Sequence, residues 1–257
     1  GISTATTWNF KTAATPPVIT DNTTATTVNQ GEPVTISATI TDGESAITAA
    51  SIIFRSVTEG SATELRSMTP SGDTYTATVD ASEIGELGIE YKITATSLGG
   101  TKTSDSFKQV KIQSSGLAIP YSAFGGNQSN YRIVSVPLDL TSKAVSSVFN
   151  ELGEANKEEW RMYHYDGSTK ELSPSSQLVP GKGYWLIVRT DPDESLNSGA
   201  GTSVTATPDN PFKIQLKADW NQIGNPYNFN ISWADVQAAN PGLPGLRIFD
   251  GAMKDGS

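Results

Sequence analysis

The sequence predicts a mainly β protein: a β-sandwich followed by a second β-rich domain that carries short helices. Short runs of alternating apolar and polar residues recur between turn residues, which is the pattern of half-buried strands. Hydrophobic residues make up only 36% of the chain, below the usual share, and threonine, serine and glycine fill much of the rest, a composition that suits strands and turns. The pattern of Tyr131–Pro137 also returns at Trp220–Pro226, so we interpret the second domain as an internal duplication.

Residues 1–14 precede the first predicted domain. Trp8 and Phe10 alternate with polar neighbours, as in a strand, and resemble the closing strand of a bacterial Ig-like domain. Pro16-Pro17 forms a stiff extended linker, because proline fixes the backbone and removes hydrogen-bond donors. We therefore expect residues 1–14 to be the terminal strand of a preceding module or a linker. Because the chain begins at Gly1 rather than at methionine, we interpret it as a piece of a longer protein.

Residues 15–115 contain repeated strand patterns. In Val34–Ile40 the apolar residues fall on one face, and an Asp-Gly turn follows at Asp42-Gly43. Three later runs repeat this arrangement: Ser51–Arg55, Thr74–Val79 and Ile89–Ala95. Several strands at such spacing, separated by polar turns, predict a β-sandwich.

The same region carries local motifs that resemble a known class. These are Gly31-Glu-Pro-Val-Thr-Ile36, Gly72-Asp-Thr-Tyr75, and Gly88–Ala95 followed by Gly99-Gly100. They resemble the Ig-like or fibronectin-III-like modules of bacterial extracellular proteins, over roughly residues 15–113. The resemblance implies a spacer or a binding platform.

The first copy of the duplicated domain covers about residues 131–188, within the domain 116–257. After the strand Tyr131–Pro137, apolar residues at helical spacing predict a helix over residues 145–152, capped by Thr141 or Ser142. The remaining predicted elements of this copy are the strand Trp160–Tyr165, the hairpin turn Asp166-Gly167 and the central strand Tyr184–Val188.

The second copy covers about residues 220–257 and repeats this order. We expect Trp220–Pro226 to be its strand, Ser232 to open its helix as a cap, and Asp250-Gly251 to be its hairpin turn. The given sequence contains no counterpart of Gly183-Tyr-Trp185 after this turn. We therefore interpret the second copy as truncated.

Two signatures in this domain resemble a recurring C-terminal repeat region of large secreted bacterial surface proteins. They are Pro-Gly-x-Gly-Tyr-Trp, found at Pro180–Trp185, and Trp-Asn-x-Ile-Gly-Asn-Pro, found at Trp220–Pro226. The resemblance implies an extracellular or cell-surface location and neighbouring modules of the same polypeptide as partners. It implies no particular chemistry.

Charge and composition limit which kinds of partner the protein can bind. The formal net charge is −9 and the pI is about 4.6, so the chain lacks the basic field that nucleic acid requires. No apolar run approaches the ~20 residues of a membrane helix, so we expect no membrane insertion. The chain has no cysteine, so stability must come from burial and sheet hydrogen bonds.

The sequence shows no recognisable catalytic motif, and we predict no catalytic residue. His164 is the only histidine, and it alternates with tyrosines in a predicted strand. The chain lacks the Gly-x-Ser-x-Gly pattern that would position a nucleophilic serine beside such a base. Paired carboxylates can hydrolyse glycosides, but no pair stands out among the many acidic residues.

Aromatic residues are the better candidates for ligand binding, because exposed rings stack on sugars. Most aromatics of the second domain occupy repeated positions, which is typical of core packing. The candidate ligand-binding residues are Trp185, Trp233 and Tyr165.

The candidate metal is calcium, and we predict no other cofactor. Asp191, Asp193 and Glu194 supply the hard oxygen ligands that calcium prefers, although they do not follow the spacing of an EF-hand loop.

Together these features predict a non-catalytic extracellular module of a larger secreted or surface protein, acting in adhesion, spacing or presentation. The alternative is a carbohydrate-binding accessory module of a secreted hydrolase, with polysaccharide as its partner. A weaker alternative is a hydrolase that uses carboxylates.

Overall fold

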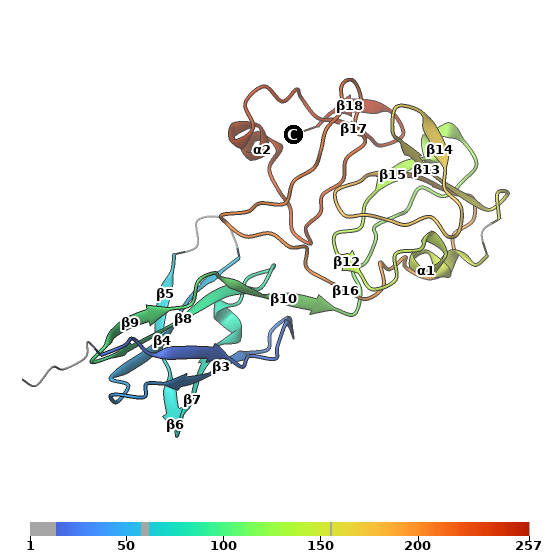
Figure 1. Cartoon of the computed structure of the whole chain (residues 1–257). Coiled ribbons are helices and arrows are strands. Elements are labelled where there is room, and N and C mark those ends of the chain that lie inside the picture. The colour runs from blue at the N-terminus through green and yellow to red at the C-terminus, as the bar shows by residue number, and fades with distance from the viewer. Residues whose placement is uncertain (1–13, 58–61, 155, 257) are drawn as a thin grey trace, which may run out of the picture.

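The structure is a computed structural model that describes residues 14–57, 62–154 and 156–256. It is mainly β, with 39% of residues in strands and 8% in helices, and almost all strand pairs are antiparallel (Figure 1). The predicted β-rich class is therefore confirmed. The predicted strand around Trp8 and Phe10 lies outside the described residues. No helix in the described ranges is long and apolar enough to cross a membrane.

Residues 18–114 form most of two sheets. The first has the order β1-β3-β7-β6, with bounds Val18–Asp21, Val34–Thr41, Thr74–Val79 and Thr69–Ser71. The second has the order β12-β16-β10-β8-β4-β5, with bounds Asp139–Leu140, Gly201–Thr202, Lys108–Ser114, Ile89–Ser97, Ala49–Ser56 and Glu64–Ser67. Two short strands join it, β2 (Thr27–Asn29) beside β10 and β9 (Gly100–Thr103) beside β8.

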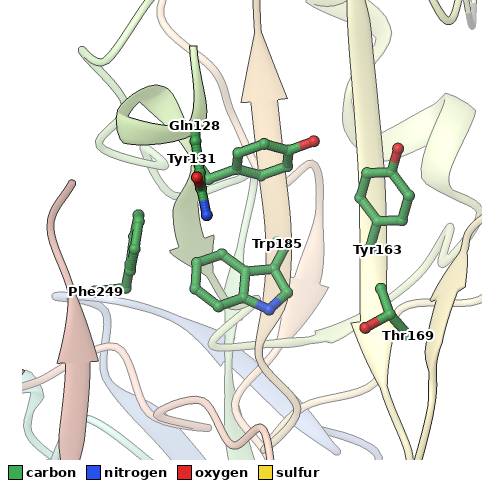
Figure 2. A pocket seen from close by; sticks show the side chains of 6 residues that line it. All are labelled: Gln128, Tyr131, Tyr163, Thr169, Trp185 and Phe249. Atoms are coloured by element: carbon green, nitrogen blue, oxygen red, sulfur yellow. The ribbon is translucent and has the colours of Figure 1, made fainter. Parts of the chain in front are cut away.

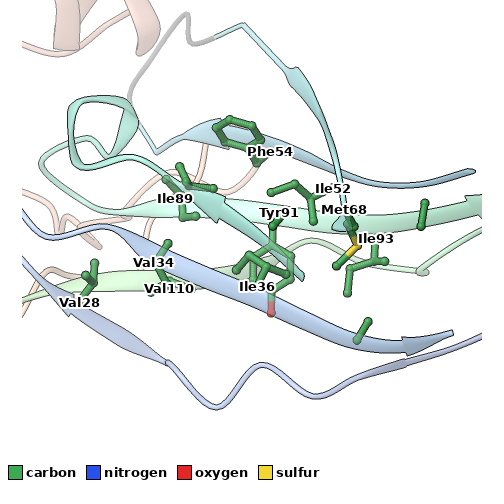
Figure 3. Packing of buried hydrophobic residues seen from close by; sticks show 14 of the residues in the cluster. Val28, Val34, Ile36, Ile52, Phe54, Met68, Ile89, Tyr91, Ile93 and Val110 are labelled. Carbon is green, nitrogen blue, oxygen red and sulfur yellow. The ribbon is translucent and has the colours of Figure 1, made fainter. Parts of the chain in front are cut away.

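One apolar core lies between these two sheets (Figure 3). Ile36 of β3 contributes from the first sheet, and Phe54 of β4 and Ile93 of β8 contribute from the second; all three are almost fully buried. The predicted alternation of Val34–Ile40 is confirmed, because every second side chain of this run is buried. The core therefore forms where period-two patterning turns apolar side chains to one face of each sheet.

The second sheet continues past the predicted domain boundary at residues 115/116. β10 pairs with β16, and β16 pairs with β12, so strands from the second domain extend a sheet of the first. The buried hydroxyl of Ser203 donates to the carbonyl oxygen of Leu87 (3.0 Å) and accepts from the backbone N–H of Ile112 (3.1 Å). The two predicted domains are thus joined by sheet hydrogen bonds as well as by the chain.

A second apolar core lies on one face of a third sheet, of order β11-β15-β13-β14. Its strands are Arg132–Val134, Tyr184–Val188, Trp160–Tyr165 and Thr169–Glu171. The predicted central strand is confirmed, because β15 pairs with β11 on one side and β13 on the other. The predicted turn at Asp166-Gly167 joins β13 to β14, with Gly167 in the left-handed region at φ 80°.

The predicted first-copy helix is shorter than expected and capped differently. It divides into α1 (Val145–Val148) and a 3-10 turn (Asn150–Leu152), and ends before Gly153 at φ 69°. The prediction of Thr141 or Ser142 as its cap is wrong, since the cap position is Ala144, which has no capping side chain. Burial of Val145 and Val148 holds this turn in place instead of local capping.

The predicted second-copy strand Trp220–Pro226 is wrong, since the segment is irregular and has only an isolated bridge, between Ile223 and Lys182. The Asn221 side chain bonds the backbone of Lys217 and Asp219, which competes with strand pairing. The predicted helix and hairpin are present. α2 spans Trp233–Ala239 with Ser232 as its cap, and β17 (Arg247–Phe249) pairs with β18 (Met253–Asp255) across Asp250-Gly251.

Candidate functional site

The outer face of the third sheet carries an aromatic cleft. Along β15 the side chains of Tyr184 and Leu186 are buried in the core, so the alternation of the strand turns Trp185 to the opposite face. Trp185 pairs directly with Ile133 of β11 and Tyr163 of β13. The register of three strands therefore sets what surrounds its ring.

Four aromatic rings converge at this cleft, which has a volume of about 330 Å³. The ring of Trp185 lies edge-on to Phe249 at 4.9 Å and to Tyr131 at 6.3 Å, and Tyr131 lies 6.2 Å from Tyr163 between ring centroids. Figure 2 shows Trp185 between Phe249 and Tyr163, with Tyr131 beside it. Phe249 comes from β17, so both predicted copies contribute to one site.

Polar groups stand at the margin of the cleft. Gln128 and Thr169 line it, as do Tyr131 and Tyr163, whose rings carry hydroxyls. Burial, together with the neighbouring Tyr131 and Glu171, raises the pKa of Tyr163 to about 12, so its hydroxyl remains a hydrogen-bond donor at neutral pH. The cleft thus combines flat apolar walls with a few uncharged donors and acceptors.

An ion pair fixes the position of the Tyr163 ring. Arg161, two residues earlier on the same face of β13, makes two hydrogen bonds to the Glu171 carboxylate at 2.9 and 3.0 Å. Its guanidinium lies 5.1 Å from the centroid of the Tyr163 ring, within cation–π range. The hydrogen bonds from Arg161 lower the pKa of Glu171 from its usual value. One wall of the cleft is therefore held in place before any ligand binds.

Of the three predicted ligand-binding residues, only Trp185 lies in this cleft. Tyr165 lines a separate, more polar cleft of about 490 Å³ together with Asp166, Lys217 and Trp220. Trp220 is 63% exposed, so the expectation that repeated aromatics are core is wrong for this residue. Burial of Tyr184 does meet that expectation.

Trp233, the third candidate, belongs to neither cleft. It opens α2, is half-buried, and donates from its indole N–H to the carbonyl oxygen of Pro244 at 3.2 Å. This hydrogen bond fastens α2 to the loop that precedes β17, which gives Trp233 a local packing role.

The candidate calcium ligands lie in the exposed loop after β15. The backbone N–H of Asp193 donates to the Asp191 carboxylate at 3.3 Å, and Asp193 has a positive φ of 61°. Within the described ranges, no three acidic or histidine side chains gather closely enough to hold a metal ion. Calcium binding by Asp191, Asp193 and Glu194 therefore stays a prediction.

His164 has a structural position. Its Nδ1 atom lies 2.9 Å from the carbonyl oxygen of Gly183, and its ring packs 5.4 Å from that of Tyr184. Among the described residues that line the aromatic cleft, none is a histidine or a carboxylate. His164 itself lines the second, more polar cleft, beside Tyr165 and Asp166.

The glycines of the two sequence signatures meet each other in the structure. A Cβ atom on Gly224 would lie 2.3 Å from Cβ of Ser135 and 2.7 Å from the carbonyl oxygen of Lys182. A Cβ atom on Gly183 would lie 2.6 Å from the carbonyl oxygen of Ile223. The N–H of Gly183 donates to Gln222 O, and that of Gly224 donates to Gly181 O. Close backbone contact between the segments of the two signatures thus explains why these positions require glycine.

Sequence reasoning missed three of the four rings around the cleft as partners of one site. Tyr163 and Phe249 lie on β13 and β17, and Tyr131 lies just before β11, so their convergence depends on strand register. The available signal was the alternation of β13 and β15, which puts Tyr163 and Trp185 on the faces opposite to Met162 and Leu186.

Compared with known proteins, the chain matches no protein-family model, and a search of curated proteins also finds no match.

Proposed function

We propose that this chain is a non-catalytic module of an extracellular or cell-surface protein, and that it holds a carbohydrate chain in the aromatic cleft. Within this proposal the first domain is an Ig-like sandwich and the second is an internal duplication. The proposed role is adhesion: the two-domain body spaces and presents the cleft to a glycan. Neighbouring modules of the same polypeptide are its proposed covalent partners.

The convergence of Tyr131, Tyr163, Trp185 and Phe249 carries this proposal. A pyranose ring presents flat faces of C–H groups and an equator of hydroxyls, so it matches aromatic walls with polar groups at their margin. Gln128 and Thr169 supply neutral side chains for those hydroxyls. A charged ligand finds less here, because the lining residues within the described ranges carry no formal charge.

The shared sheet supports the presenting role. β16 and β12 extend the sheet of the first domain, and Ser203 of the second domain hydrogen-bonds to Leu87 and Ile112 of the first. Arg55 adds an ion pair to Asp209, which crosses between the predicted domains. Several bonds of different kinds at one junction restrict hinge motion, so the cleft keeps a fixed direction relative to the first domain.

The test is affinity electrophoresis of the full chain through gels that contain a panel of neutral polysaccharides. We expect one of them to retard the protein, and Trp185→Ala to weaken that binding by about tenfold or more, because it removes the central ring. Trp220→Ala is the matched control, since it removes an exposed tryptophan that lies outside the aromatic cleft.

Three results would contradict the proposal. Absence of retardation by every polysaccharide argues against carbohydrate binding. Loss of binding in Trp220→Ala but not in Trp185→Ala would move the site to the second cleft. Hydrolysis of any glycan in the panel by the purified chain would replace the non-catalytic function with the carboxylate hydrolase.

A further inference from the structure

The second, more polar cleft is a candidate binding site in its own right, with a volume of about 490 Å³. Three segments line it: residues 164–167 at the end of β13 and in its turn, residues 179–182 before β15, and residues 212–223. Among the described residues, none lines both this cleft and the aromatic cleft. A ligand of the second cleft is therefore independent of the carbohydrate proposed for the first.

Hydrogen bonds hold the walls of the second cleft together. The backbone N–H of Tyr165 donates to Oε1 of Gln222 at 2.8 Å, and the N–H of Gly183 donates to the carbonyl oxygen of Gln222 at 3.2 Å. The Asn221 side chain accepts from the backbone N–H of Lys217 at 2.8 Å and donates to its carbonyl oxygen at 2.9 Å. The cleft is therefore formed before any ligand binds, which lowers the entropic cost of binding.

The charges that line this cleft have the opposite balance to those of the whole chain. The chain carries a formal net charge of −9, whereas three lysines and two aspartates line the cleft. Lys217 forms an ion pair with Asp166. Lys182 and Lys213 are both exposed and have no ion-pair partner among the described residues. The cleft is therefore a locally cationic place on an acidic protein, and it favours a ligand with a negative charge.

An exposed aromatic ring and neutral amides stand beside these lysines. The side chain of Trp220 lines the cleft and is 63% exposed. Gln215, Asn221 and Gln222 also line it, and Nε2 of Gln222 is buried without a hydrogen-bond partner among the described residues. Because Oε1 of Gln222 accepts from Tyr165, Nε2 is the donor end of this amide. Such a lining suits a ligand that has a face of C–H groups, several hydroxyls and a carboxylate.

We propose that the second cleft binds a single uronic acid of an otherwise neutral glycan. The face of the sugar ring stacks on Trp220, and the carboxylate pairs with the ammonium groups of Lys182 and Lys213. A polymer with a carboxylate on every sugar is disfavoured, because the net charge of the chain repels a polyanion. This inference goes beyond the proposed function, since it needs neither the aromatic cleft nor binding of a neutral polysaccharide.

The experiment titrates the full chain with methyl glucuronide and follows binding by saturation-transfer NMR of the sugar. We expect saturable binding that weakens as salt is added, because salt screens exposed charges. Methyl glucoside, which lacks the carboxylate, should bind about fivefold more weakly, as expected for the loss of exposed ion pairs. Trp220→Ala should weaken binding of both sugars by a similar factor, about fivefold, because the stacking ring is lost.

Charge variants separate the cleft from the general field of the protein. Lys182→Gln and Lys213→Gln should weaken binding of methyl glucuronide and leave that of methyl glucoside unchanged. Lys170→Gln is the matched control, since it removes the same charge from an exposed lysine on β14 that lines neither cleft. All four altered side chains are exposed, so we expect these variants to fold.

Several outcomes would overturn this inference. Equal binding of methyl glucuronide and methyl glucoside would show that the lysines do not select the ligand. Competition by acetate at the same concentration as methyl glucuronide would show an anion site without sugar recognition. Equal losses in Lys170→Gln and Lys213→Gln would point to unspecific attraction. Loss of binding in Trp185→Ala but not in Trp220→Ala would place the acidic sugar in the aromatic cleft. Absence of binding would also overturn it, while leaving the test with neutral polysaccharides unaffected.

Discussion

The two predicted copies of the second domain contain similar elements but differ in how far their apolar residues are buried. In the first, β11, α1 and β13 surround β15 and bury a shared core. In the second, α2 and the β17–β18 hairpin form as expected, yet their apolar residues stay half-buried or exposed. In the first copy β15 joins the two halves and completes a core, whereas α2 and the hairpin of the second copy are held by single contacts, such as the Trp233–Pro244 hydrogen bond and the packing of Phe249 on Trp185.

The difference also shows how the second copy is used. Tyr227 and Phe229 stack at 5.0 Å and pack against a small buried cluster at the domain junction, formed by Val57, Leu87, Val204 and Ala206. Residues 222–224 pack along the segment that leads into β15, and Phe249 closes one side of the aromatic cleft. The second copy thus contributes to the junction and to the first copy rather than to a core of its own.

The largest effect on the free energy of unfolding should come from β15, the central strand of the first copy. Leu186→Ala removes a side chain that is 0% exposed and should lower the free energy of unfolding by about 3 kcal/mol, through lost burial and the cavity left behind. Leu246→Ala, at the half-buried position that corresponds to Met162, should cost less than about 1 kcal/mol. Urea denaturation followed by tryptophan fluorescence measures both. Equal costs would mean that the second copy has a core after all.

An intermediate effect should come from the contact between the copies. Gly224→Ala would bring a methyl group within 2.3 Å of Ser135 Cβ, so the backbone must move, at a cost of about 1–3 kcal/mol. Gly245→Ala is the control, because no atom lies within 4 Å of its new methyl group. Thermal unfolding measured by circular dichroism compares them. A neutral Gly224→Ala would show that the signature glycines do not hold the copies together.

The smallest effect should come from the ion pair on the first copy. Arg161 lowers the pKa of Glu171, so the carboxylate contributes stability above its unfolded pKa, and this contribution is lost as the pH falls through the lowered folded value. Glu171→Gln should therefore reduce the loss of stability that accompanies the fall in pH. Asp255→Asn, which breaks the more exposed Arg247–Asp255 pair of the second copy, should leave it unchanged. The midpoints of urea denaturation of both variants, measured between pH 3 and pH 7, roughly the range of carboxylate titration, test this prediction.

Much of this fold follows from local patterns, and the exceptions share one physical cause. The alternation of Val34–Ile40 and Tyr184–Val188 predicts two strands correctly, because a buried face imposes period two directly on the sequence. Trp220–Pro226 has a similar pattern, but within the described residues it forms only an isolated bridge, and the Asn221 side chain bonds the backbone of Lys217 instead. A strand depends on its partners, and a sequence pattern does not show whether they are present.

The candidate site was predictable only in its central residue. Trp185 stands out as a tryptophan in a predicted strand, but its companions depend on which strands pair and in which register. Trp233 looked equivalent, yet a hydrogen bond to Pro244 gives it a packing role. Recognition surfaces assembled across strands are non-local, so residue type alone separates them poorly from core aromatics.

The sheet that runs from β12 through β16 into β10 has a mechanical consequence. A force that pulls the second domain away from the first must break the backbone hydrogen bonds of this sheet and separate Ser203 from Leu87 and Ile112. It does not merely extend a flexible linker. The junction therefore resists tension in the way that a sheet does. Force applied at the aromatic cleft would pass through this junction into the body of the first domain.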